Sequence, residues 1–254
     1  HCPCWWQGNP VADKEIIDTE LQLRDLDSVE KKLSKVERAA KTGDVKAKKE
    51  AAALQRYKEA LLAGKSARTV QADEEEKMAV ADLQLLTAKP VIYIANVDEA
   101  SIHTGNKYVD ALKELVKNEN AEVVMISAAI EAQIAELESM EDRQVFLQEY
   151  GLEESGLNKL LRASYHLLDL ITYFTAGEKE VRAWPIVKGW TAPQAAGVIH
   201  TDFEKGFIRA EVIKLADYQQ YKTEQGCKEA GKMAVEGKAY IVEDGDIMHF
   251  RFNV

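Results

Sequence analysis

The stretch that decides the fold is RAWPIVKGWTAPQAAGVIHTDFEKGFIRAEV, residues Arg182–Val212. Its beginning belongs to an apolar segment, Val181–Val187, which is predicted to be a strand. Thr191 precedes an Ala-Pro pair and is typical of a helix N-cap, so we expect a helix of about ten residues that ends at Gly206. Apolar and charged residues then alternate over Ile208–Ile213, which predicts a strand with one buried face. Strand, helix and strand together indicate a compact α+β module.

The end of the chain is expected to complete this module. Tyr240–Val254 is predicted to form two strands around an Asp-Gly turn at residues 244–245. Pro185 has no backbone N–H, so the Val181–Val187 strand is predicted to lie at a sheet edge or to carry a bulge. His249 alternates with apolar neighbours and should be exposed, whereas His200 and the nearby Asp202 are expected to form a local cap or pair.

These residues carry a family resemblance. Ile199–Ile213 (IHTDFEKGFIRAEVI), Lys228–Lys232 (KEAGK), Glu236–Lys238 (EGK) and the terminal MHFRFNV together resemble the C-terminal TGS domain of the YchF-type Obg-like ATPases. The resemblance extends back to Gly8. It implies a small β-grasp fold for residues 171–254.

Length and composition set the outer limits. The chain has 254 residues, 46% of them hydrophobic, which is enough for two or more domains. Its net charge of −10 excludes nucleic-acid binding by bulk charge, so any such site must be a local patch. No apolar run approaches the roughly 18 residues of a membrane-spanning helix, and no basic segment followed by an apolar one suggests a signal peptide. We therefore expect a cytoplasmic protein without membrane contact.

The first seven residues, HCPCWWQ, do not fit the family pattern. Cys2 and Cys4, with His1 nearby, could be read as metal ligands. Their spacing differs from that of a zinc knuckle, and no second Cys or His pair completes four ligands. We favour an unmatched leader over residues 1–7 and expect no metal site. The third cysteine, Cys227, could suggest a redox-sensing thiol. This interpretation rests on a single thiol, whose closest basic neighbour in the sequence is Lys228.

Residues 8–86 are expected to form a helical coiled-coil arm. Two helices, Lys14–Lys41 and Val45–Ala63, carry apolar residues at spacings of three and four and are separated by Thr42–Asp44. Between residues 31 and 49 there are eight basic and two acidic side chains. This basic tip is either a solvated helix surface or a surface that contacts RNA phosphates. The basic residues are Lys31, Lys32, Lys35, Arg38, Lys41, Lys46, Lys48 and Lys49.

Residues 87–170 are predicted to be part of an α/β domain. An apolar run over Lys89–Ala95 suits a parallel strand covered on both faces, and a second strand is expected over Glu122–Ile126 after a helix over Tyr108–Asn118. Polar residues after the carboxyl ends of such strands are where ligands bind. Further helices are expected over Asp73–Leu86, Glu131–Tyr150 and Gly151–Leu170, the last with a leucine-rich buried face and a packed His166.

The family resemblance assigns chemistry to those strand ends. It implies a P-loop NTPase domain in which Asn-x-x-Glu replaces the guanine-reading Asn-Lys-x-Asp, so that ATP is preferred over GTP. The nucleotide-base contacts implied here are Asn96, Val97, Glu99, Ser127, Ala128 and Ala129. The cofactors implied are ATP and, in the intact family member, Mg²⁺, whose ligands are not in this chain.

The phosphate-binding part of such a site is not found in this sequence. Gly64-Lys65-Ser66 follows a predicted helix instead of a strand, and Glu59 stands where a Walker A motif needs its first glycine. The fold class expected is therefore α/β and α+β: a partial P-loop NTPase domain with an inserted helical arm, followed by a β-grasp TGS domain. The resemblance implies a ribosome-associated ATPase, favoured as a monomer, with this chain alone inactive and without catalytic residues. The alternative is a ribosome- or RNA-binding module without catalytic activity.

Overall fold

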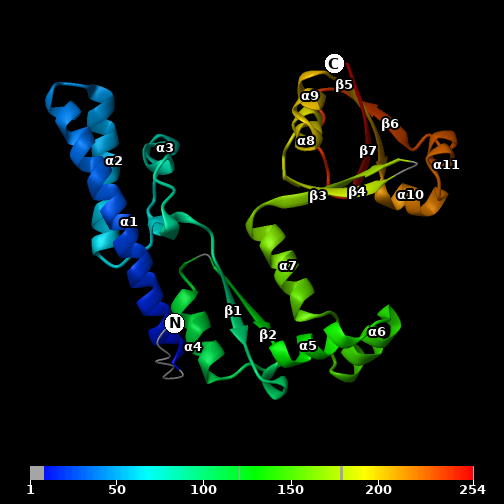
Figure 1. The fold of residues 1–254 in the computed structure, drawn as a ribbon, viewed down its shortest axis with the longest axis horizontal. Helices are drawn as coiled ribbons and strands as arrows, with labels where there is room; N and C mark the ends of the chain where they lie inside the picture. The colour runs from blue at the N-terminus through cyan, green and yellow to red at the C-terminus, as the bar shows by residue number, and fades with distance from the viewer. Residues whose placement is uncertain (1–8, 120, 178–179, 254) are drawn as a thin grey trace. The chain divides into compact units, whose positions relative to one another are not determined.

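The computed structural model describes residues 9–119, 121–177 and 180–253 (Figure 1). It divides into two compact units, residues 1–163 and residues 164–254, which are treated separately below. The leader cysteines, Cys2 and Cys4, lie outside the described residues.

The first unit begins with a helical hairpin, as the sequence predicted (Figure 1). Helix α1 spans Pro10–Lys41 and helix α2 spans Val45–Leu62. Helix α1 starts earlier than expected because the Asn9 side chain accepts a hydrogen bond from the Val11 N–H and Pro10 suits the first turn. Val29 and Leu54 are fully buried between the two helices, with further apolar residues around them. The apolar stripes therefore pack against each other and hold the hairpin together.

The helix predicted over Asp73–Leu86 is shorter in the structure. Helix α3 spans Glu74–Ala81, and a separate 3-10 turn, η2, spans Leu86–Ala88. After α3 the backbone turns at Gln84, whose φ is +46°, and the buried carboxylate of Asp25, in α1, accepts hydrogen bonds from the backbone N–H groups of Leu86 and Thr87 at 2.7 Å each. A carboxylate distant in sequence therefore holds the segment that was predicted to be the end of the helix, and local helix propensity does not reveal that.

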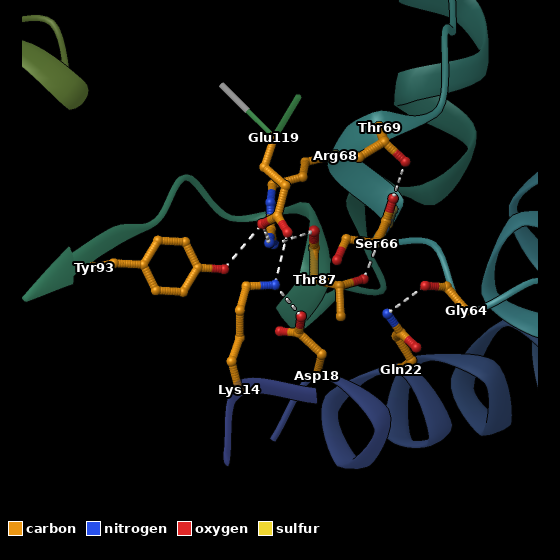
Figure 2. A network of polar contacts seen from close by, with 11 residues as sticks. Lys14, Asp18, Gln22, Gly64, Ser66, Arg68, Thr69, Thr87, Tyr93 and Glu119 are labelled. Carbon is orange, nitrogen blue, oxygen red and sulfur yellow. Dashed lines mark hydrogen bonds and ion pairs between the residues drawn. The ribbon is translucent and has the colours of Figure 1, made fainter. Parts of the chain in front are cut away.

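A second polar network fixes both ends of the hairpin to the strands (Figure 2). Glu119 accepts from Lys14 of α1 at 2.6 Å, from Arg68 at 3.0 Å and from Tyr93 at 2.9 Å. Arg68 lies in the 3-10 turn η1 (Ala67–Thr69) that follows α2. Burial would raise the pKa of Glu119, but the hydrogen bonds from Lys14, Arg68 and Tyr93 hold it below its usual range. Burial would lower the pKa of Lys14, and its bonds to Asp18 and Glu119 raise it instead.

Strands β1 (Ile92–Asn96) and β2 (Glu122–Ile126) pair in parallel, with helix α4 (Lys107–Val116) between them in sequence. The β-α-β succession is confirmed, and β2 has the bounds that were predicted. The expectation of a strand covered on both faces was wrong, since the Ile94 side chain is 49% exposed. In the described chain this sheet has two strands, and Val124, which stands opposite Ile94 in β2, is buried.

The acidic segment predicted as one helix over Glu131–Tyr150 is two helices, α5 (Ala128–Glu136) and α6 (Met140–Glu149). The backbone turns extended at Leu137, and Ser139 then caps α6 by accepting from the Asp142 N–H.

Helix α7 (Gly156–Leu167) begins where a Cβ at Gly156 would meet the Ile126 side chain at 2.7 Å, so only glycine fits beside β2. The buried leucine face expected on this helix was wrong. Leu157 and Leu161 are more than half exposed, and His166 is exposed as well. Apart from Gly156 at its start, the buried residue of α7 is Ala163.

The second unit is a five-stranded mixed sheet with strand order β4-β3-β7-β5-β6. Strands β3 and β7 pair in parallel and the other pairs are antiparallel. The strands are β3 (Leu170–Ala176), β4 (Val181–Val187), β5 (Phe207–Lys214), β6 (Met233–Glu236) and β7 (Asp246–Phe252). The helices are α8 (Ala192–Ile199), α9 (Thr201–Lys205), α10 (Leu215–Tyr221) and α11 (Glu224–Glu229).

Three expectations for this unit are corrected. The single helix ending at Gly206 is two, because His200 is extended and caps α9 by accepting from the Asp202 N–H. This bond, with the His200–Asp202 pair at 3.3 Å, confirms the local capping role. Strand β5 is not buried on one face only: Val212 packs with α8 on one face, and Ile213 packs with α10 and α11 on the other. Ile208 is exposed because a bulge shifts the register there.

The predicted terminal hairpin was also wrong. The Asp244 carboxylate accepts from the Thr172 N–H, and the Gly245 N–H donates to the Thr172 carbonyl, both at 2.8 Å. The turn therefore docks on β3, and β7 enters the sheet between β3 and β5. Asp246 is fully buried and accepts from Lys214 and from the Tyr240 hydroxyl, each at 2.7 Å. Burial, with the Asp246 bond, raises the pKa of Tyr240 to about 12.

The edge position predicted from Pro185 is confirmed, since β4 lies at one end of the sheet. Pro185 stands opposite Thr172, whose N–H and C=O are engaged with residues 244 and 245. A residue in an antiparallel pair exchanges both hydrogen bonds with its partner or neither. The Pro185 nitrogen therefore faces the open edge, where no donor is needed.

Candidate functional site

The two polar loops predicted to bind a nucleotide base are brought together. Asn96 ends β1 and stands in register with Ile126, the last residue of β2. Its side-chain oxygen accepts a hydrogen bond from the Ala128 N–H at 3.0 Å. This bond joins the loop after β1 to the first turn of α5, so the ends of the two strands form one surface.

Ser127 has an unusual environment at the centre of this surface. It is 1% exposed, and its hydroxyl oxygen has no hydrogen-bond partner among the described residues. A buried hydroxyl without a partner is costly and is commonly explained by a ligand, ion or water. Ala128 and Ala129 follow it and are exposed at the N-terminus of α5, where backbone N–H groups have no partner in the helix.

Glu99 is held by two side chains that the sequence analysis did not single out. The Gln133 amide donates to one carboxylate oxygen at 3.1 Å, and the Tyr150 hydroxyl lies 3.4 Å from the other. Desolvation, followed by the Glu99 charge, raises the pKa of Tyr150. Spacing along α5 could have placed Gln133 near this end of the sheet, but Tyr150 follows a helix whose position depends on tertiary packing.

Val97 has a different position from the other predicted base contacts. Its side chain is 7% exposed and packs in the core beneath the loop with Val109 and Ile130. Its N–H donates to the Ile126 carbonyl at 2.9 Å. Asp98 caps the 3-10 turn η3 (Glu99–Ser101) by accepting from the Ser101 N–H. Val97 therefore supports the loop, and its side chain does not face a ligand.

The basic tip of the arm divides into two groups. Three of its lysines already have acidic partners: Lys31 with Asp27, Lys32 with Glu50 and Asp82, and Lys49 with Glu75. The other five are exposed and have no ion pair within the described chain: Lys35, Arg38, Lys41, Lys46 and Lys48. These five surround the turn between α1 and α2.

The remaining candidates carry no visible chemistry. Gly64 accepts a hydrogen bond from the Gln22 amide and ends the arm, so the Gly-Lys-Ser sequence there is a helix exit. Cys227 is fully buried, and burial raises the pKa of its thiol, which makes it unreactive and removes the redox reading. Within the described ranges, His, Cys, Asp and Glu side chains form no group of three that could hold a metal ion.

The helices of the described chain include none that is both long enough and apolar enough to cross a bilayer.

The comparisons with known proteins agree with this architecture. Residues 170–253 match the family "YchF-GTPase_C: Protein of unknown function (DUF933)". The chain is 54% identical over 246 residues to the "Ribosome-binding ATPase YchF" of Haemophilus ducreyi, covering 97% of this chain and 67% of the relative. The Bacillus subtilis protein of the same name is 50% identical over 248 residues, with 97% and 68% covered.

A solved structure, that of the Schizosaccharomyces pombe YchF GTPase, superposes with a TM-score of 0.84 at 34% identity and covers 98% of this chain and 68% of that one. The chain thus spans about two thirds of the length of these relatives. Identity of this level over nearly all of its residues means that the chain belongs to the YchF family, with a YchF C-terminal (TGS) domain.

Proposed function

We propose that the surface at the ends of β1 and β2 binds the adenine base of ATP. The observation that carries this proposal is the Asn96–Ala128 hydrogen bond beside the unpartnered Ser127 hydroxyl. The relatives named above carry "ATPase" in their names. Asn96 would hold the two loops together through the Ala128 N–H, and the N–H of the exposed Ala129 would donate to a ring nitrogen of the base.

Glu99 is proposed to favour adenine. Gln133 and Tyr150 donate to its carboxylate and so orient it at the rim of the same surface. Its carboxylate can take a hydrogen bond from the exocyclic amino group of adenine, and it is one methylene longer than the Asp that accepts from guanine N1 and N2 in the guanine-reading motif. Unpaired polar groups left by the wrong base are a strong source of discrimination.

The residues fit the base end of ATP and not its phosphate end. The chain contains no GxxxxGK[ST] motif, and a magnesium ion finds no carboxylate cluster among the described residues. Bound ATP supplies the phosphoanhydride that an ATPase cleaves, but no residue here is assigned to that step. For the 254-residue chain alone we therefore expect turnover equal to a buffer blank and ATP affinity weaker than about 1 mM.

Base recognition can be tested on the chain itself by two-dimensional NMR with millimolar adenosine and guanosine. Adenosine should shift the amide signals of Ala128 and Ala129, and guanosine should shift them less. Asn96→Ala should abolish the difference, while Asn158→Ala, on α7, serves as the matched control. In a form that also carries the preceding third found in the relatives, Glu99→Asp should raise GTP affinity. Binding of GTP at least as tightly as ATP by the parent of that form would contradict the proposal.

We propose as a second function that the arm contacts ribosomal RNA phosphates. The five exposed and unpaired cations at the α1–α2 turn support it, together with the words "ribosome-binding" in the relatives' names. When these cations bind RNA phosphates, the counterions condensed on the RNA are released. The affinity of the arm for RNA should therefore fall as the salt concentration rises. The tip has no aromatic side chain between residues 31 and 49, so we expect little sequence preference.

Co-sedimentation with ribosomes at several salt concentrations tests the arm. Replacing Lys35, Arg38, Lys41 and Lys46 by Glu should abolish binding without changing the helix content. The matched control makes the same charge change in the second unit, at Lys188, Lys222, Lys228 and Lys238, and should keep most of the binding. If the arm variant co-sediments as well as the parent, the basic tip is only a solvated surface.

A further inference from the structure

A cavity of about 350 Å³ opens in the second unit between the β3–β4 pair and helices α8 and α9. Its lining includes a tryptophan and three phenylalanines, and we call it the aromatic slot. Trp184 of β4, Phe203 of α9 and Phe252 of β7 form its apolar walls, and Thr175 and Arg182 add polar groups. The three rings are only partly buried, although the sheet beside them buries Tyr173 completely.

The walls of the slot are fixed before any ligand arrives. The Trp184 indole N–H donates to the Thr175 hydroxyl at 2.9 Å, which sets the orientation of the indole ring. Phe203 and Phe252 stack with ring centroids 3.7 Å apart and an angle of 25° between the rings. Rings held in this way lose little conformational freedom on binding, so the slot is pre-organised.

A cation stands at the mouth of the slot. The guanidinium of Arg182 lies 4.1 Å from the Trp184 ring centroid, in cation–π geometry. It forms an ion pair with Glu180, which also lines the slot, but their atoms are 3.9 Å apart and no hydrogen bond joins them. The N–H donors of Arg182 are therefore available to a phosphate beside the slot.

We propose that the aromatic slot binds one unstacked base of single-stranded RNA, with Arg182 on the adjoining phosphate. The inference rests on the proposed RNA-binding role of the protein. It adds a surface for base stacking, which the arm tip, with no aromatic side chain, does not provide. Aromatic faces hold bases of any sequence by stacking, and a nearby cation tracks the backbone. The partly buried aromatic side chains offer surface on which a base can stack, whereas an aliphatic peptide side chain would leave the Arg182 donors unused.

The test measures fluorescence anisotropy of the full chain with two labelled probes. One is a single-stranded oligoadenylate of about twelve nucleotides, within the site sizes of single-strand binders. The other is inorganic polyphosphate of similar charge, which has no bases. Trp184→Leu should weaken oligoadenylate binding about tenfold, the loss expected for one stacked base, and leave polyphosphate binding unchanged.

Two further variants keep the result interpretable. Trp190→Leu is the matched control, because Trp190 packs against the same core without lining the slot, and it should bind both probes like the parent. If Trp184→Leu fails to fold by circular dichroism, Phe203→Leu should give the same base-dependent loss.

Equal oligoadenylate binding by Trp184→Leu and the parent overturns the slot proposal. If the arm charge reversal still abolishes binding in that case, the arm proposal stands alone. A parent that binds neither probe overturns the slot proposal, and the arm proposal is then decided by the co-sedimentation with ribosomes.

Discussion

Two isoleucines in strands show how differently the two units are built. Ile186 of β4 is 2% exposed, although its strand lies at a sheet edge, because the helices of the second unit cover that face. Ile94 is in the middle of β1, in a parallel pair, and is 49% exposed. In the second unit helices pack on both faces of the sheet, whereas in the described part of the first unit Ile94 is exposed, although Val124, its register partner in β2, is buried.

The difference teaches where the stability of this chain resides. The second unit joins its first and last strands, β3 and β7, at the centre of the sheet, so its core closes on itself. The first unit depends on two polar networks, centred on Glu119 and Asp25, to join a helical hairpin to a small sheet. Both units contain apolar clusters, and the first adds these charged networks between its hairpin and the rest of the unit.

The largest expected effect comes from truncating these two isoleucines. Ile186→Ala should destabilise the second unit by about 4 kcal/mol, since it removes buried methyl groups and leaves a cavity. Ile94→Ala should cost about 1 kcal/mol, because half of its side chain is already in water. Urea unfolding, monitored by hydrogen exchange in each unit separately, measures the loss in free energy of unfolding for both variants. Equal losses at the two positions would contradict the comparison.

The next effect concerns the Glu119 network. Glu119→Gln should destabilise the first unit by about 2 kcal/mol, because hydrogen bonds to two cations lose their charge. The folded-state pKa of Glu119 is below its ordinary value of 4.5, so its contribution is present above that pH and is lost as the pH falls below it. The variant should lose this acid dependence.

Urea midpoints measured between pH 3 and pH 7 check this prediction, a range of about four units that brackets ordinary carboxyl pKa values. Glu114→Gln, an exposed carboxylate paired with Lys117, is the control and should change little. An acid dependence that survives in Glu119→Gln would assign it to other carboxylates.

The smallest effect on stability is expected at the sheet edge. Pro185→Val restores an N–H that points away from the sheet, so the free energy of unfolding should change by no more than about 0.5 kcal/mol. The same change gives the edge a new donor and should promote strand pairing between molecules. Analytical ultracentrifugation should show self-association of the variant, and a strictly unchanged sedimentation profile would mean that Pro185 does not protect the edge.

Local patterns predicted those elements whose causes are local. The bounds of β2 and β4, the hairpin turn at Thr42–Asp44 and the edge position of Pro185 follow from nearby residues. The errors share another cause, which is a partner distant in sequence. Asp25 binds the backbone at Leu86, where the helix was predicted to end, and Thr172 binds the Asp244 turn, so that β7 pairs with β3 instead of forming a hairpin.

The candidate site shows the same division. The resemblance pointed to Asn96 and Ser127, and the structure brings their loops together through the Ala128 N–H. It also predicted Val97 as a contact, but strand-to-loop geometry turns this side chain into the core. Spacing along α5 could have placed Gln133 near this end of the sheet, but Tyr150 could not be found in this way, since its approach to Glu99 depends on how α6 packs.

Asp25 also has a consequence for how this arm can change in evolution. Its carboxylate accepts hydrogen bonds from the backbone N–H groups of Leu86 and Thr87. The Thr87 hydroxyl in turn accepts from the Ala67 N–H at 2.9 Å. An extra residue inserted in α1 ahead of Asp25 would turn the Asp25 side chain by about 100° around the helix axis and break its contacts with Leu86 and Thr87. Insertions beyond Asp25 that add matched whole turns to both helices leave them intact. The length of the arm can therefore change at its tip, whereas the contacts that join the arm to residues 86 and 87 have to stay in register with Asp25.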